Sequence, residues 1–163
     1  MQTFRVSVSK DYLVFASAHF ITLKGHHCET LHGHNYRVGL AVEGSVDDEI
    51  SFVVDFSVLK QIARRVVDAV DHKVLLPAGN PKLAITEADG LVNVSVNGAH
   101  RYQFPQGDCV LLPIPNSTAE MLAAYLGEQV RQDLTDRGIS NLTRLELEVE
   151  ESPGQAAVYR RAL

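Results

Sequence analysis

Apolar and polar residues alternate along much of the first forty residues, which is the pattern of half-buried β-strands. Phe4–Val8 alternates with a period of two, and alternate residues of 15–19 would share one face of a second extended stretch. A third strand is predicted over 35–42, starting as early as Leu31 and ending in a turn at 43–45. The chain is therefore predicted to begin with strands.

Two later segments change to the three- and four-residue spacing of amphipathic helices. The first follows Asp55, a suitable N-cap, and its apolar positions recur from Val58 to Val70. The second follows the Ser-Thr-Ala-Glu sequence at 117–120, which has the form of a capping box, and continues to Gly138. Both segments are predicted to be helices that bury one face.

Between these helices lies a segment of different composition, 77–115, which holds five of the six prolines. Two strand-like runs within it, 91–96 and 100–104, flank Asn97-Gly98. Because this residue pair strongly favours a type I′ turn, we predict an inserted β-hairpin.

The end of the chain completes an α+β pattern. Leu145, Leu147 and Val149 alternate with glutamates, which predicts a half-buried strand, and 156–159 is its candidate partner. The order strand, strand, helix, hairpin, helix, strand, strand favours mainly antiparallel pairing over βαβ winding. A length of 163 residues fits one domain, 1–163, with the insertion at about 77–115.

Composition and charge exclude several classes of function. A formal net charge of -5 without a block of Lys or Arg disfavours binding to bulk nucleic acid. The apolar runs are too short for a transmembrane helix and no basic-then-apolar leader precedes Phe4, so we expect a cytoplasmic protein with no membrane partner. The two cysteines, Cys28 and Cys109, lack Cys-x-x-Cys spacing, which argues against a disulfide framework.

A cluster of histidines is the first candidate for chemistry, since five of the seven fall within sixteen residues. On a strand, His32-Gly33-His34 places two imidazoles on one face, about 6–7 Å apart. His19 is the best third ligand for a catalytic zinc ion, which has three protein ligands and an open position. Two alternatives stay open: ordinary histidines without a metal, and a closed structural zinc site with Cys28 as the fourth ligand.

Cys28 itself lies in a loop that leads into the histidine strand, next to His26 and His27. Metal and imidazolium charge there would lower the pKa of its thiol and make it a base or nucleophile near neutral pH. The simpler interpretation is a small buried hydrophobe, which we favour for Cys109.

Weaker candidates lie elsewhere in the chain. Asp71-His72 ends the first predicted helix, where the helix dipole favours an imidazolium, although such a histidine is often only a cap. Glu151 is in phase with Val149 on the buried face of its strand, so its carboxylate needs a partner. Cations that would suit an anionic substrate are Lys24, Arg37, Arg64 and Arg65.

Taken together, these motifs resemble the 6-pyruvoyl-tetrahydropterin synthase / 6-carboxy-tetrahydropterin synthase family from about Phe4 to Arg160. The Cys-x-x-x-His-Gly-His spacing resembles that of the bacterial carboxy-type branch. The residues that carry the resemblance are His19, 28–35, 54–60, Asp71-His72, 118–120, Glu151 and Tyr159.

The resemblance implies a tunnelling fold (T-fold): an antiparallel four-stranded sheet with two helices on one face, here with the inserted hairpin. It also implies a homo-oligomer, a trimer or hexamer, with active sites at subunit interfaces. Family enzymes bind one Zn²⁺ per site, which here would be held by His19, His32 and His34. Their small-molecule substrate is 7,8-dihydroneopterin triphosphate.

The resemblance also implies a role for each remaining site residue. Cys28 would be the catalytic base, and His72, oriented by Asp71, the second proton-transfer group. Glu151 would anchor the pterin ring. Thr118 and Glu120 match a second motif on the pterin side.

The implied product is 6-carboxy-5,6,7,8-tetrahydropterin, formed with loss of triphosphate and acetaldehyde. The connection from Asp71 to Glu120 is longer than is common in the family, which leaves two related reactions open: 6-pyruvoyl-tetrahydropterin synthesis and aldol cleavage of the pterin side chain. A non-catalytic, zinc-stabilised binding protein is the alternative of another class.

Overall fold

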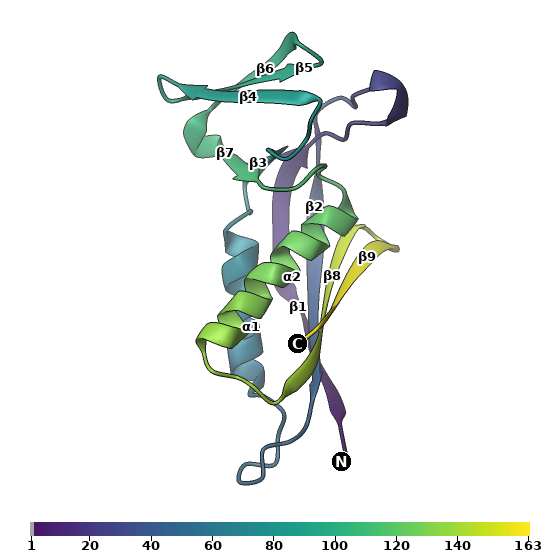
Figure 1. Cartoon of the computed structure of the whole chain (residues 1–163), viewed down its shortest axis with the longest axis vertical. Coiled ribbons are helices and arrows are strands. Elements are labelled where there is room, and N and C mark those ends of the chain that lie inside the picture. The colour runs from purple at the N-terminus through teal and green to yellow at the C-terminus, as the bar shows by residue number, and fades with distance from the viewer. Residues whose placement is uncertain (1) are drawn as a thin grey trace.

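A six-stranded sheet with the order β7-β3-β1-β2-β8-β9 forms the centre of the computed structural model, which describes residues 2–163 apart from the side chain of His26 (Figure 1). The pairs β1–β2, β2–β8 and β8–β9 are antiparallel, whereas β3 runs parallel to β1 and β7 parallel to β3. The strands are β1 Phe4–His19, β2 His32–Gly44, β3 Lys73–Pro77, β7 Cys109–Leu112, β8 Leu142–Ser152 and β9 Gln155–Ala162.

This sheet confirms the α+β class and corrects the strand count. The expected four antiparallel strands are present, and the two parallel strands β3 and β7 extend the sheet at one edge. Both are short apolar runs without alternation, so periodicity did not identify them as strands. The two extended stretches predicted before His19 are one strand, β1, with an irregularity in its pairing between Ser9 and Val14.

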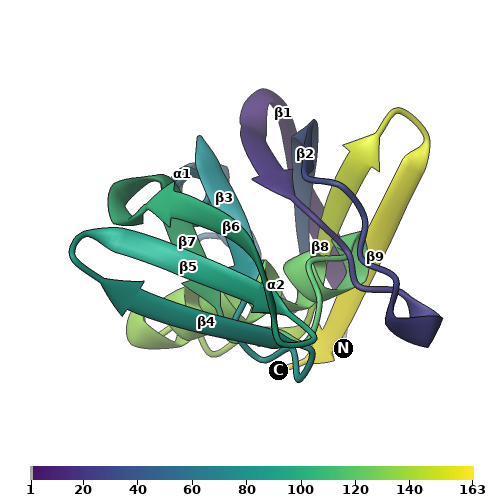
Figure 2. The same ribbon diagram turned by 90° about the horizontal axis from the view of Figure 1, so that it is seen from above.

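Two helices, α1 Phe56–Asp68 and α2 Ala119–Asp136, cover one face of the sheet (Figures 1 and 2). Asp55 caps α1 as predicted, since its side chain accepts from the Ser57 amide at 2.7 Å. The capping box predicted for α2 is wrong. Thr118 is the N-cap, because the buried Ser117 hydroxyl donates instead to the Phe20 carbonyl at 2.8 Å.

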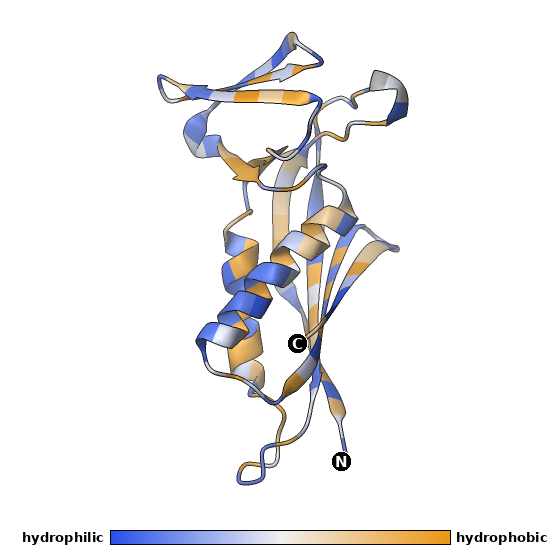
Figure 3. Ribbon diagram, viewed as in Figure 1, coloured by the Kyte–Doolittle hydropathy of each residue, from blue (hydrophilic) through white to orange (hydrophobic). Residues whose placement is uncertain are grey.

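The main core fills the space between the helices and the sheet. Figure 3 shows hydrophobic and hydrophilic positions alternating along β8 and β9, as expected for strands with only one buried face. The largest fully buried side chains include Phe15, Tyr36, Leu40, Leu59, Ile62, Leu122 and Leu126.

No helix among the described residues is long and apolar enough to span a membrane.

The insertion forms a second sheet of three antiparallel strands, β4 Leu83–Ala88, β5 Leu91–Val96 and β6 Ala99–Pro105. Asn97 (φ 49°) and Gly98 (φ 83°) confirm the predicted primed turn between β5 and β6. A similar turn at Asp89-Gly90 adds β4, which the sequence analysis missed. Figure 1 places this sheet at the same end of the molecule as the 20–31 loop, which contains a short 3₁₀ turn at Lys24–His26. A second such turn, Gln106–Asp108, leads from β6 into β7.

Candidate metal centre and active site

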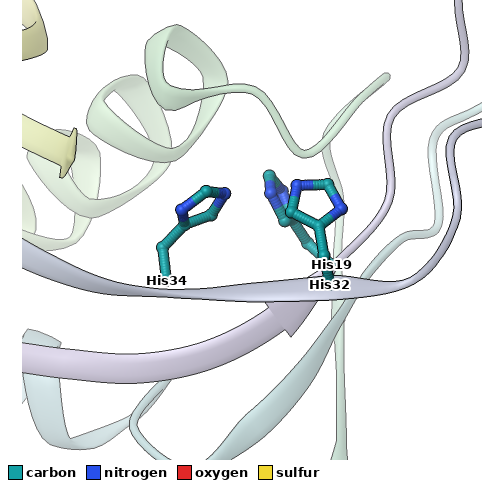
Figure 4. A group of neighbouring side chains, drawn as sticks. All are labelled: His19, His32 and His34. Atoms are coloured by element: carbon teal, nitrogen blue, oxygen red, sulfur yellow. The ribbon is translucent and has the colours of Figure 1, made fainter.

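Three histidines converge where the ends of β1 and β2 pair (Figure 4). His19 lies opposite His32, and Ser17 lies opposite His34, so alternation along the strands turns all three rings to the same face. One ligand nitrogen from each ring lies within 4.8 Å of the others. The group is compact enough to hold one metal ion, as the His-x-His pattern with His19 predicted.

The hydrogen bonds of these rings suit metal ligands. Nδ1 of the buried His19 lies 2.7 Å from the Ser117 carbonyl, and Nδ1 of His32 lies 2.8 Å from the Thr30 carbonyl. A carbonyl only accepts, so Nδ1 carries the proton in each neutral ring and Nε2 keeps its lone pair. Nε2 of His19 is buried and has no hydrogen-bond partner among the described residues. A metal ion bound to its lone pair would satisfy this nitrogen.

Burial sets the charge of His19. It lowers the pKa of the imidazole, His32 and His34 lower it further, and the bond to the Ser117 carbonyl and the Glu151 carboxylate oppose this. The ring is therefore neutral at physiological pH. Neutral imidazole is the form that binds metals.

Glu151, on β8, reaches the edge of this group; its phase in the strand had predicted only a carboxylate on the buried face that needs a partner. Its Oε1 lies 3.6 Å from Nε2 of His19 and 3.8 Å from Nε2 of His34. Glu151 also lines one hollow with Thr118 and Glu120 at the start of α2, so the three residues assigned to the pterin side by resemblance lie together.

Tyr36 is a member of this group that the sequence analysis missed, although it continues the alternation of His32 and His34. Its ring is fully buried and lies edge-on to His34, with the centroids 5.4 Å apart. Burial, and then the Glu151 carboxylate, raises the pKa of its hydroxyl far above the usual value. Tyr36 therefore stays protonated and can serve only as a neutral donor or acceptor.

Asp71 and His72 form the predicted pair, with Oδ2 2.9 Å from Nδ1. Burial opposes ionisation of Asp71, but hydrogen bonds from the Ala16 amide and His72 hold the pKa of its carboxyl below its usual value. The ring of His72 is 82% exposed. It lines a hollow with Ala18 and Gly33, among others.

The Asp71–His72 pair does not meet the histidine group within one chain. Ala18 and Gly33 alternate along their strands with the residues that turn toward the metal centre, so the hollow opens mainly on the opposite face of the sheet, although His34 also borders it. The structure therefore separates two parts of the site that the resemblance combines.

Cys28 lies in the 20–31 loop, half-buried, and packs against the small apolar cluster beneath the inserted sheet. Burial raises the pKa of its thiol and the positive charge of Arg101 opposes the rise. These protein groups therefore do not lower the pKa of the Cys28 thiol as predicted, because the neighbours of Cys28 are mainly apolar. His27 is exposed, and the His26 side chain, also invoked for that lowering, lies outside the described residues.

The other predicted residues contribute less to the site. Among the described residues, the group able to hold a metal consists of the three histidines without Cys28. Burial raises the pKa of the Cys109 thiol, which fits a structural cysteine in β7. Arg64 and Arg65 form ion pairs with Asp68 and Asp133.

The sequence matches the family model of 6-pyruvoyl tetrahydropterin synthase over residues 7–162. A Methanocaldococcus jannaschii protein that carries the name 6-carboxy-5,6,7,8-tetrahydropterin synthase is 35% identical over 152 residues, 93% of this chain and 91% of that protein. The Rickettsia bellii 6-carboxy-5,6,7,8-tetrahydropterin synthase is 26% identical, over 71% of this chain and 74% of its own length. The crystal structure of 6-pyruvoyl tetrahydropterin synthase from Plasmodium vivax matches with a TM-score of 0.92 at 34% identity and covers 100% of both chains.

We predict that the chain binds one divalent metal ion at the three histidines. His32→Ala should weaken the binding of Zn²⁺ or Co²⁺ more than about tenfold, because two imidazoles cannot complete the site. Titration of the metal-free protein measures this, and His100→Ala, at an exposed histidine on β6, is the matched control. Unchanged affinity in His32→Ala would rule out this centre.

Proposed function

The chain belongs to the 6-pyruvoyl tetrahydropterin synthase family, and from this premise we propose that it is a zinc-dependent pterin synthase. It acts on 7,8-dihydroneopterin triphosphate and forms 6-carboxy-5,6,7,8-tetrahydropterin, triphosphate and acetaldehyde. The observation that carries the proposal is the group of three metal-competent histidines beside the hollow lined by Glu151, Thr118 and Glu120. The same proposal places the reaction in the cytoplasm, consistent with two free cysteines.

The residues around the hollow recognise the pterin. The carboxylate of Glu151 accepts two N–H bonds from the amino-pyrimidine edge of the ring, a charge-assisted bidentate contact. Thr118 and Glu120 border the same hollow. Zinc on His19, His32 and His34 would polarise the side-chain oxygens of the substrate and so acidify the adjacent C–H bonds.

Two groups move protons. Cys28 removes a proton from the acidified side chain as its thiolate, which the charge of bound zinc would favour where the neighbouring protein groups do not. His72 serves on the other side of the substrate, where Asp71 fixes the proton on Nδ1 and leaves Nε2 free to accept or donate.

These two groups come from different chains in our proposal. Within one chain, the hollow lined by His72 opens on the face of the sheet opposite the metal histidines. A second copy can present its His72 to the Cys28 side of the first, and closed symmetry then repeats the contact around a trimer or hexamer. Oligomerisation is thus a condition for activity.

A second candidate reaction is aldol cleavage of the side chain of the same substrate. Two further Plasmodium vivax structures are of 6-pyruvoyltetrahydropterin synthase variants in which a catalytic glutamate is replaced, and they match this chain with a TM-score of 0.92. Here Glu29 follows Cys28 directly and is half-buried. A carboxylate beside a thiol offers a second base for a different proton of the substrate.

We predict that Cys28→Ala keeps the metal and the bound pterin but loses about 10²–10⁴-fold in turnover, the usual contribution of a general base. Mass spectrometry of the products and metal analysis of the same preparation measure this, with Cys109→Ala as the control. Lost metal and a lowered melting temperature would instead support Cys28 as a fourth ligand in a structural zinc site.

The identity of the product separates the candidate reactions. A carboxy product with acetaldehyde supports the main proposal, whereas a pyruvoyl product identifies the synthase reaction that gives the family its name. An aldol product that survives Cys28→Ala and disappears in Glu29→Gln would establish the second candidate. No turnover by the zinc-loaded protein would favour a non-catalytic binding protein.

We also predict that Glu151→Gln weakens pterin binding by about 1–3 kcal/mol, the scale of losing a charge-assisted hydrogen bond. Fluorescence titration with neopterin, at verified metal content, measures the loss. Glu148→Gln changes an exposed carboxylate on the same strand and should bind normally. Equal affinities for both variants would return Glu151 to the role of a solvated carboxylate.

A composite site predicts complementation between two inactive variants. Co-expressed Cys28→Ala and His72→Ala chains should regain about a quarter of wild-type activity, since each site needs one intact residue from each of two chains. Each variant assayed alone is the control. Mixed oligomers that stay as inactive as the single variants would show that both residues act within one chain.

A further inference from the structure

We propose that Arg101 and Tyr102, on β6 of the inserted sheet, are positioning residues that hold the Cys28–Leu31 backbone beside the metal strand. The proposal deepens the proposed function and rests on the role of Cys28 as base. It assigns a role to the 77–115 insertion, which supplies no residue to the histidine group or to the hollow lined by Glu151.

Tyr102 connects the inserted sheet to both ends of the 20–31 loop. The Leu31 amide donates to the Tyr102 hydroxyl at 3.2 Å, and Leu31 directly precedes the metal ligand His32. The Tyr102 ring lies 5.3 Å from the ring of Phe20, which directly follows His19. One side chain thus contacts the chain next to a metal ligand on each of the two strands.

Arg101 holds the segment around the thiol. Its Nη2 donates to the carbonyl oxygens of Cys28 at 3.4 Å and Glu29 at 3.3 Å. Its Nε donates to the Tyr102 hydroxyl at 3.1 Å, and its guanidinium carbon lies 5.3 Å from the Tyr102 ring centroid. Because the N–H groups of a guanidinium are fixed in one plane, Arg101 can bind two successive carbonyls and orient Tyr102 at once.

Apolar packing supports these polar contacts. Cys28 and Leu31 pack, together with Tyr102, against a small buried cluster that is separate from the main core. β5 of the insertion supplies half of the buried members of this cluster. Its fully buried members are Phe20, Leu76, Val92 and Val94.

The rest of the loop is anchored farther from the histidine strand. The Glu29 amide donates to the Ile21 carbonyl at 2.9 Å, and the Leu23 amide donates to the His27 carbonyl at 2.7 Å. These bonds close the loop on itself, and Asn116 holds its far end: the Asn116 side chain accepts from the Thr22 amide at 3.2 Å and donates to the Thr22 carbonyl at 3.0 Å. Arg101 and Tyr102 of the insertion bind the 28–31 backbone directly. A misplacement of about 1 Å at a reacting group can cost about 10²-fold in rate.

The first test uses Tyr102→Phe, which removes only the hydroxyl and keeps the ring in the apolar cluster. Amide hydrogen exchange in 28–31 should become at least about tenfold faster, because the Leu31 amide loses its acceptor. The kcat should fall by about 10- to 100-fold while KM and metal content stay unchanged. Gln103→Ala, on the same strand but bonded to Asn93, is the matched control.

The second test measures the charge of Arg101 at the thiol. Iodoacetamide alkylation of Cys28, followed by peptide mass spectrometry over a range of pH, gives the midpoint of thiol ionisation, with Cys109 as an internal standard. Arg101→Gln should move the Cys28 midpoint to higher pH, leaving the negative charge of Glu29 unopposed, and Arg101→Lys should restore it in part.

The outcomes separate this proposal from the function on which it rests. Unchanged exchange in Tyr102→Phe together with an unchanged alkylation profile in Arg101→Gln would overturn the positioning role. A wild-type protein that does not convert dihydroneopterin triphosphate would refute the proposed function. In that case exchange and alkylation still decide whether the insertion holds the Cys28 segment.

Discussion

The antiparallel register between β1 and β2 is the constraint on which the candidate site depends. It places His19 opposite His32 and turns His34 to the same face. Directly below, Phe15 lies opposite Tyr36, and their buried rings stack with centroids 4.6 Å apart. A slip of one residue would expose one ring of this stack and turn part of the histidine group to the other face, so the apolar core fixes the geometry of the metal centre.

The same alternation divides the chemistry of the molecule between two faces of one sheet. The three histidines and Glu151 lie on the face that the helices cover, where burial keeps His19 neutral. The Asp71–His72 pair borders the uncovered face, where the His72 ring is 82% exposed within one chain. The two sides of the sheet thus give their imidazoles different surroundings, one buried and one open to solvent within the single chain.

Features that depend on neighbouring residues were predictable from the sequence, whereas those that depend on distant pairing were not. The shared face of His32 and His34, the Asp55 cap and the turn at Asn97-Gly98 follow from local rules of alternation and backbone preference. β3 and β7 show no such local pattern. Ser117 does not cap α2 as predicted, because its hydroxyl donates to the carbonyl of Phe20, which directly follows β1. The contacts of Arg101 with the Cys28 loop likewise exist only once the insertion packs against that loop.

The two tight turns of the insertion carry a consequence for the order in which the chain folds. Each joins strands that are adjacent in the sequence, so β4, β5 and β6 pair through short loops that close in microseconds. The main sheet must instead pair β2 with β8, which come from opposite ends of the chain, at a much larger cost in loop-closure entropy. We therefore expect the inserted sheet to form early, before the slower pairing of β1, β2 and β8 brings the histidines together.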